Sequence, residues 1–137
     1  MAYSFSGVFA DGDAEVMSAV LLEAPGVGRM IEQPLRGFGV KFREELEEGF
    51  GEQQFARNFP LVSWSRKFPK ITFVYLYVEC FGGDCDHSGF AFRDGQVLQE
   101  IEFDESDMPL RELMKHLGVT FGENTYFPPF EREYFRK

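Results

Sequence analysis

Residues 71–103 constrain the fold of this chain more than any other stretch, because three strand-like segments there are separated by two tight turns. Residues 71–81 are β-branched or aromatic almost throughout, which is typical of a buried strand. The dipeptides Gly82-Gly83 and Asp94-Gly95 both favour two-residue hairpin loops. We therefore expect a three-strand antiparallel meander with strands at 71–81, 84–93 and 96–103.

Helical and strand patterns alternate through the rest of the chain. Outside the meander, we expect strands at 3–10, 28–33 and 35–42 and helices at 14–24, 60–68 and 109–117. Residues 43–58 carry clustered glutamates, and their pattern fits a short helix followed by a loop. The element order is then β-α-β-β-α-β-β-β-α. Two β-α-β-β runs favour helices mainly on one face of an antiparallel sheet, so the expected fold class is α+β, ferredoxin-like or related.

The chain has 137 residues, a length that suits a single α+β domain over 1–137. Its last segment, 119–137, is rich in Phe and Tyr, and we expect this aromatic tail to pack on the domain. No apolar run approaches the length of about 18 residues needed to span a bilayer. The N-terminus lacks the pattern of a signal peptide and the chain has two cysteines, so we expect a cytoplasmic protein with no membrane partner.

The net charge of −9, from 23 acidic and 14 basic residues, narrows the range of partners. An acidic surface repels the phosphate backbone, so we expect no nucleic-acid partner. A basic protein partner is compatible with this charge. The alternative is that the acidity only keeps a small protein in solution.

The two short turns predict the register of the meander, because hairpin loop length determines which residues face each other. The expected cross-strand pairs are Cys80 with Cys85, Phe92 with Val97, Ser88 with Ile101, and His87 with Glu102. The carboxylate of Glu102 should then favour the charged form of His87 and raise its pKa. An ordinary surface pair is the alternative meaning of that juxtaposition.

Alternation of side chains predicts that both faces of the meander are apolar near the middle. One face gathers Phe73, Tyr75, Tyr77, Phe90, Phe92, Val97, Ile101 and Phe103. The other gathers Val74, Leu76, Val78, Cys80, Cys85, His87, Ala91 and Leu98. A single helical layer covers only one face, so we expect the aromatic tail, a second copy of the chain or a foreign partner on the other.

The densest polar run, residues 79–87, admits four interpretations. In the first, the cysteines are structural. In the second, Cys80, Cys85 and His87 bind zinc, with His116 or an acid as fourth ligand. A third interpretation is a redox pair, because directly opposed strand residues have a Cα separation that suits a disulfide. The fourth is a thiol nucleophile activated by His87, which the surrounding acids oppose by raising the thiol pKa. We expect no cofactor, and zinc is the alternative that this pattern would allow.

Acidic residues follow the third strand of the meander and the turn after it. They are solvated charges, or they form an acidic docking strip for a basic partner. Aromatic side chains supply most of the affinity at protein interfaces. The expected partner-binding residues are therefore Tyr75, Tyr77, Phe90, Phe92, Glu100, Glu102 and Asp104. His116 lies in the last turn of the final helix, where a cation complements the helix dipole.

One segment resembles known families. It contains Phe68-Pro69, Phe73, Tyr75, Cys80-Phe81-Gly82-Gly83 and Gly89. This pattern is similar to that of small bacterial ferredoxin-like proteins of the Api92 type and of immunity proteins of polymorphic toxin systems. The resemblance implies a binding protein rather than an enzyme, and it carries over no catalytic residues. We therefore expect an acidic protein-binding module, an immunity or inhibitor protein that masks a basic partner. A metal-binding or thiol-dependent protein centred on Cys80, Cys85 and His87 is the alternative.

Overall fold

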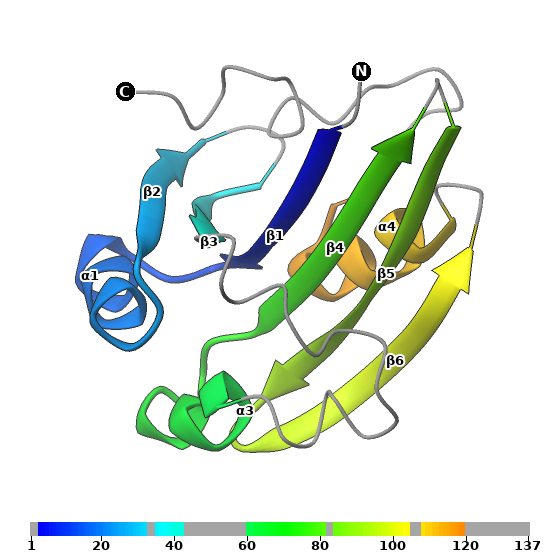
Figure 1. Ribbon diagram of the computed structural model, residues 1–137. Coiled ribbons are helices and arrows are strands. Elements are labelled where there is room, and N and C mark those ends of the chain that lie inside the picture. Colours follow the sequence, from blue (N-terminus) through cyan, green and yellow to red (C-terminus); the bar gives the residue numbers. More distant parts are fainter. Residues whose placement is uncertain (1–2, 33–34, 43–59, 82–83, 105–107, 120–137) are drawn as a thin grey trace.

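The computed structural model describes residues 3–32, 35–42, 60–81, 84–104 and 108–119 (Figure 1). The elements are β1 (Tyr3–Ala10), α1 (Ala14–Glu23), β2 (Gly26–Ile31), β3 (Gly37–Phe42), α3 (Pro60–Trp64), η2 (Ser65–Lys67), β4 (Phe73–Phe81), β5 (Asp84–Arg93), β6 (Gln96–Asp104), α4 (Met108–Met114) and η3 (Lys115–Leu117). Their order confirms the predicted β-α-β-β-α-β-β-β-α sequence of elements. The expectations for 43–58, for the acidic turn at 105–107 and for the tail beyond 119 lie outside the described residues.

All six strands form one antiparallel sheet in the order β2-β3-β1-β4-β5-β6. The part β2-β3-β1-β4, with α1 and α3 on one face, has the arrangement of a ferredoxin-like fold. The hairpin β5-β6 extends this unit beyond β4, and α4 packs on its opposite face. The α+β fold class and its ferredoxin-like strand order were therefore predictable from the sequence.

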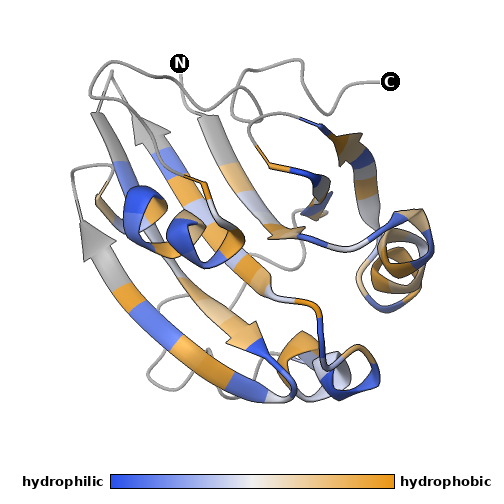
Figure 2. Ribbon diagram, turned by 180° about the vertical axis from the view of Figure 1, so that it is seen from behind, coloured by the Kyte–Doolittle hydropathy of each residue, from blue (hydrophilic) through white to orange (hydrophobic). Residues whose placement is uncertain are grey.

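The sheet separates two hydrophobic cores. On the face that we call the α1/α3 face, residues of the two helices belong to one core with sheet residues Val8, Val40, Phe73, Tyr75, Phe90 and Phe92. On the α4 face, the helix buries Leu110, Leu113 and Met114 against Phe5, Phe9, Val74, Leu76, Val78 and Ala91. Figure 2, which views the molecule from behind, has α4 in front of the sheet. Helix α4 thus supplies cover that we had expected from the tail, a second copy or a partner.

Local signals in the sequence explain where α1 begins and ends. The carboxylate of Asp13 accepts a hydrogen bond of 3.1 Å from the backbone N–H of Val16, which caps the first turn. The helix ends before Pro25, and β2 follows at once, two residues earlier than its pattern predicted. Gly26 permits this early start, because a Cβ there would collide with the carbonyl oxygen of Lys41 on β3.

A serine joins α3 to the second turn of the meander. The hydroxyl of Ser65 donates to the carbonyl of Val62 at 2.6 Å and accepts from the backbone N–H of Gly95 at 2.9 Å. In that turn, Asp94 and Gly95 have φ values of 51° and 77°, the left-handed conformations that a two-residue hairpin loop requires. The predicted turn is confirmed, and it is held against the end of α3.

The register of β6 differs from the prediction. Strand β5 pairs with β4 without interruption, and Phe92 faces Val97 as expected. Two register shifts then follow along β6, so Gly89 faces Ile101 and His87 faces Asp104. The predicted pairs Ser88–Ile101 and His87–Glu102 are wrong, because each bulge adds one residue to β6 that has no partner on β5.

The bulges also change which face some residues occupy. Ile101 packs in the core of the α4 face, opposite to the face predicted for it. Leu98, which was expected among the apolar residues of that face, is 47% exposed. A shift of one residue exchanges the two faces of a strand, and both differences follow from the first bulge.

Replacement of Leu113 tests the α4 core. Leu113→Ala removes a side chain that is 0% exposed, so we expect the free energy of unfolding to fall by about 2–5 kcal/mol. Leu22→Ala is the matched control, because Leu22 lies on α1 and is 85% exposed, and we expect a change within about 0.5 kcal/mol. Denaturant unfolding of both variants measures the difference, and equal losses would contradict the assignment of the core.

Candidate functional site

The β4-β5 hairpin brings the two cysteines together at the level of the backbone. Cys80 and Cys85 are directly opposed Cα partners, which confirms the predicted pair. Val78 is opposite His87 and lies in the core of the α4 face. Because residues two apart on a strand share a face, Cys80, Cys85 and His87 all occupy the α4 face at one end of the meander.

His87 is buried and faces an acid that the sequence did not identify. Its side chain is 8% exposed, and its cross-strand neighbours are Val78 on β4 and Asp104 on β6. The acidic neighbour is therefore Asp104 and not Glu102. The two bulges on β6 place Asp104 opposite His87 in the position expected for Glu102. The alternation of apolar and polar residues along β6 gives no sign of these bulges.

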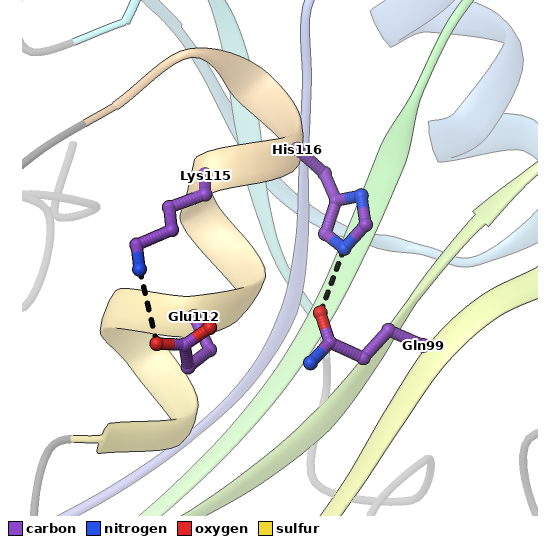
Figure 3. A network of polar contacts seen from close by, with 4 residues as sticks. All are labelled: Gln99, Glu112, Lys115 and His116. Atoms are coloured by element: carbon purple, nitrogen blue, oxygen red, sulfur yellow. Dashed lines mark hydrogen bonds and ion pairs between the residues drawn. The ribbon is translucent and has the colours of Figure 1, made fainter.

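His116 is removed from this end of the meander. Its Nε2 lies 2.7 Å from Oε1 of Gln99, in a hydrogen bond that ties η3 to β6 (Figure 3). Gln99 faces Ala91, which is four residues, or about 13 Å, along β5 from His87. His116 is therefore too far away to serve as a fourth ligand beside His87. Next to it, Lys115 forms an exposed ion pair of 3.0 Å with Glu112.

The structure describes no group of three His, Cys, Asp or Glu side chains that could hold a metal ion. This statement covers His87, His116, Glu79 and Asp86, among others. The side chains of Cys80, Cys85 and Asp104 do not belong to the described set. For these three residues, the backbone register alone describes their placement.

Three of the aromatic residues predicted to bind a partner belong to the core. Tyr75, Phe90 and Phe92 are at most 1% exposed on the α1/α3 face. The Tyr75 and Phe90 rings are stacked with centroids 5.1 Å apart, and the hydroxyl of Tyr75 is hydrogen-bonded to that of Ser6 at 2.8 Å. Packed in this way, they hold the sheet together and present no ring to a partner.

The other members of that prediction lie nearer the surface or outside the description. Tyr77 is half-buried, and Glu100 is exposed at the edge strand β6. For Glu102 and Asp104, only the place in β6 is known. Of the residues predicted to bind a partner, Tyr77 and Glu100 are therefore the described ones that are not fully buried.

Two carboxylates face each other on the α1/α3 side of the hairpin. Glu79 is the direct cross-strand neighbour of Asp86, and the next pair along the strands is Tyr77 with Ser88. The hydroxyl of Tyr77 donates to Glu79 at 3.5 Å. In the described part of the chain, no cation forms an ion pair with either carboxylate. Like charges directly opposed on neighbouring strands destabilise a sheet.

The cations of the meander gather at its other end. Arg66, Lys67, Lys70 and Arg93 are exposed there, and Arg93 Nε donates to the carbonyl of Pro69 at 3.0 Å. Arg93 follows Asp86 by seven residues on the same strand, a separation of roughly 23 Å. This distance exceeds the Debye length of about 8 Å at physiological salt, so the basic end does not neutralise the acidic end.

Comparisons with known proteins add no relative. No protein-family model matches the chain, and neither a curated protein nor a solved structure is similar to it. None of the helices in the described ranges is long and apolar enough to cross a membrane.

A double-mutant cycle tests whether Tyr75 is a structural residue. Each of the single changes Ser6→Ala and Tyr75→Phe removes one hydroxyl and leaves the other buried hydroxyl without its hydrogen-bond partner. Each should therefore lower the free energy of unfolding by about 1–3 kcal/mol. The double variant should lose less than the sum, with a coupling of about 0.5 kcal/mol or more. Denaturant unfolding gives all four values, and strict additivity would show that the two hydroxyls do not interact.

Proposed function

We propose that this chain is a protein-binding module that recognises a basic partner through the acidic end of its β4-β5 hairpin. The observation that carries the proposal is the direct opposition of Glu79 and Asp86 without a neighbouring described cation. In the free protein this arrangement costs stability. A cationic side chain of a partner, placed between the two carboxylates, would remove the repulsion.

The surroundings of the pair support a protein ligand. Tyr77 lies beside the carboxylates and is half-buried, so its ring offers apolar contact area next to the charges. Glu100 is a further exposed carboxylate on β6, where it faces Phe90, about 13 Å along β5 from Asp86. Acidic groups speed the encounter with a basic surface, and an aromatic ring contributes to affinity after contact.

The net charge of −9 shows that the whole chain, and not the hairpin alone, should attract a basic partner. A protein that masks a basic partner, as an immunity or inhibitor protein does, benefits from a long-range attraction that raises the rate of association. The resemblance of residues 68–89 to immunity proteins and to small ferredoxin-like proteins agrees with this role. We infer that the partner is a basic protein whose exposed arginine or lysine side chains meet Glu79 and Asp86.

The test compares two variants with the same change in charge. Glu79→Gln with Asp86→Asn alters the proposed surface, whereas Glu23→Gln with Glu32→Gln alters two exposed acids elsewhere, at the end of α1 and just after β2. Protein isolated from its own host at low salt is analysed by native mass spectrometry. We expect a basic partner chain to accompany the wild type and the control variant, and its occupancy to fall at least tenfold for the site variant.

The stability of the free protein provides a second readout. Removing the opposed charges should raise the free energy of unfolding of the site variant by about 0.2–1 kcal/mol, whereas the control should change little. A chain that is isolated only as a bare monomer or homodimer would contradict the proposed function. Equal loss of the partner in both variants would place the binding surface elsewhere.

A further inference from the structure

The chain has two cysteines, and the fold makes them direct neighbours across the first hairpin of the meander. Cys80 on β4 and Cys85 on β5 are Cα partners, one position away from the pair Phe81–Asp84 that flanks the turn. We propose that Cys80 and Cys85 are a redox modification site, at which a small-molecule disulfide converts the two thiols into an intramolecular disulfide bond.

The register of the hairpin determines how far apart the two backbone positions lie. A two-residue loop closes on a hydrogen-bonded pair, which here is Phe81 with Asp84. Hydrogen-bonded and non-hydrogen-bonded pairs alternate along an antiparallel ladder, so Cys80 and Cys85 form a non-hydrogen-bonded pair with Cα atoms about 4.5 Å apart. Disulfides occur at Cα separations between about 4.4 and 6.8 Å. The backbone therefore allows the bond without movement of either strand.

The two strands are restrained to different degrees at this position. On its other edge, Cys80 is paired with Tyr3 of β1, so β4 has a neighbour on both sides. The described register between β5 and β6 ends at His87, so Cys85 lies beyond the last position that β6 pairs with. At Cys85, β5 is thus held by β4 alone within the described ladders. A covalent bond adds restraint at the place where the sheet gives β5 the least.

The proposed reaction is a two-step thiol–disulfide exchange with an oxidant of the glutathione disulfide class. The thiolate of one cysteine attacks a sulfur of the oxidant, which forms a mixed disulfide and releases one glutathione thiol. The second cysteine attacks the mixed disulfide, forms the Cys80–Cys85 bond and releases the other glutathione thiol. The two protons of the protein thiols end on the two released thiols, so the cysteines are oxidised and the glutathione disulfide is reduced.

The charges near the turn favour the disulfide over free thiolates. The acids Glu79, Asp84 and Asp86 are adjacent to the cysteines in sequence, whereas the exposed cations of the meander lie at its other end. Negative charge opposes formation of a thiolate. Dithiols become strong oxidants when their thiolate form is stabilised, and these surroundings do the opposite. A mild oxidant is therefore sufficient to form the bond.

The proposed bond has a local effect, because it closes only the short segment 80–85. A bond across a short loop removes little entropy from the unfolded chain and adds little to global stability. It holds together the ends of β4 and β5, which would otherwise open locally beside the turn. The pair is thus a reversible lock on one hairpin. This inference does not depend on the proposed partner, because the bond forms and is measured in the free protein.

The experiment equilibrates the full-length, reduced protein in glutathione buffers of increasing oxidised fraction, alkylates the remaining thiols and measures the mass of the intact chain. The wild type should lose two hydrogen atoms, take up no alkylating agent and stay monomeric. Cys85→Ser with Asp84→Cys is the matched control, because it keeps two cysteines and moves one of them to face Phe81, on the other side of the sheet. We expect its intramolecular disulfide to form with an equilibrium constant at least about tenfold lower.

Further measurements separate geometry from charge and from loss of fold. Asp84→Ser keeps both cysteines and removes the charge that the control also loses, so it should oxidise as readily as the wild type. The three reduced proteins should have the same circular dichroism. Oxidation of the wild type should slow amide hydrogen exchange in β4 and β5 beside the turn, because the bond suppresses local opening.

Three outcomes would overturn the proposal. The first is a folded wild type that stays reduced in glutathione disulfide. The second is a wild type that forms only mixed disulfides or disulfide-linked dimers. The third is a control variant that forms its intramolecular bond as readily as the wild type, since the opposed register would then have no influence on the reaction.

Discussion

Strand β4 is the element on which the rest of the structure depends, because it is paired on both edges and buried on both faces. It pairs with β1 over eight positions and with β5 over nine. Its alternate residues supply both cores: Phe73 and Tyr75 lie on the α1/α3 face, and Val74, Leu76 and Val78 lie on the α4 face. Burial on both faces explains why its sequence is an almost unbroken run of apolar residues. The ferredoxin-like unit and the β5-β6 extension meet at this strand.

The hairpin between β4 and β5 was predictable from the sequence, whereas the path of β6 was not. The pair Cys80–Cys85 follows from a two-residue loop, because such a loop allows a single pairing register for the two strands. Along β6, the pattern of Val97, Leu98 and Ile101 gives no sign of the extra residues, since bulges are selected by packing and twist. Ile101 reaches the α4 core and Leu98 turns outward as a result. An error of one residue in register was enough to misplace the acid opposite His87.

The burial of the residues predicted to bind a partner depends on tertiary structure, whereas the cross-strand pairs of the first hairpin do not. Aromatic residues on a strand fit a core and an interface equally well, and only the tertiary structure assigns Tyr75, Phe90 and Phe92 to the core. Helix α4 had a clear apolar stripe, but its packing on the far face of the sheet depends on tertiary structure. The opposition of Glu79 and Asp86, by contrast, was implied by the Gly82-Gly83 turn. The role that we propose for this pair also rests on the position of the exposed cations of the meander, which lie at the other end of β5.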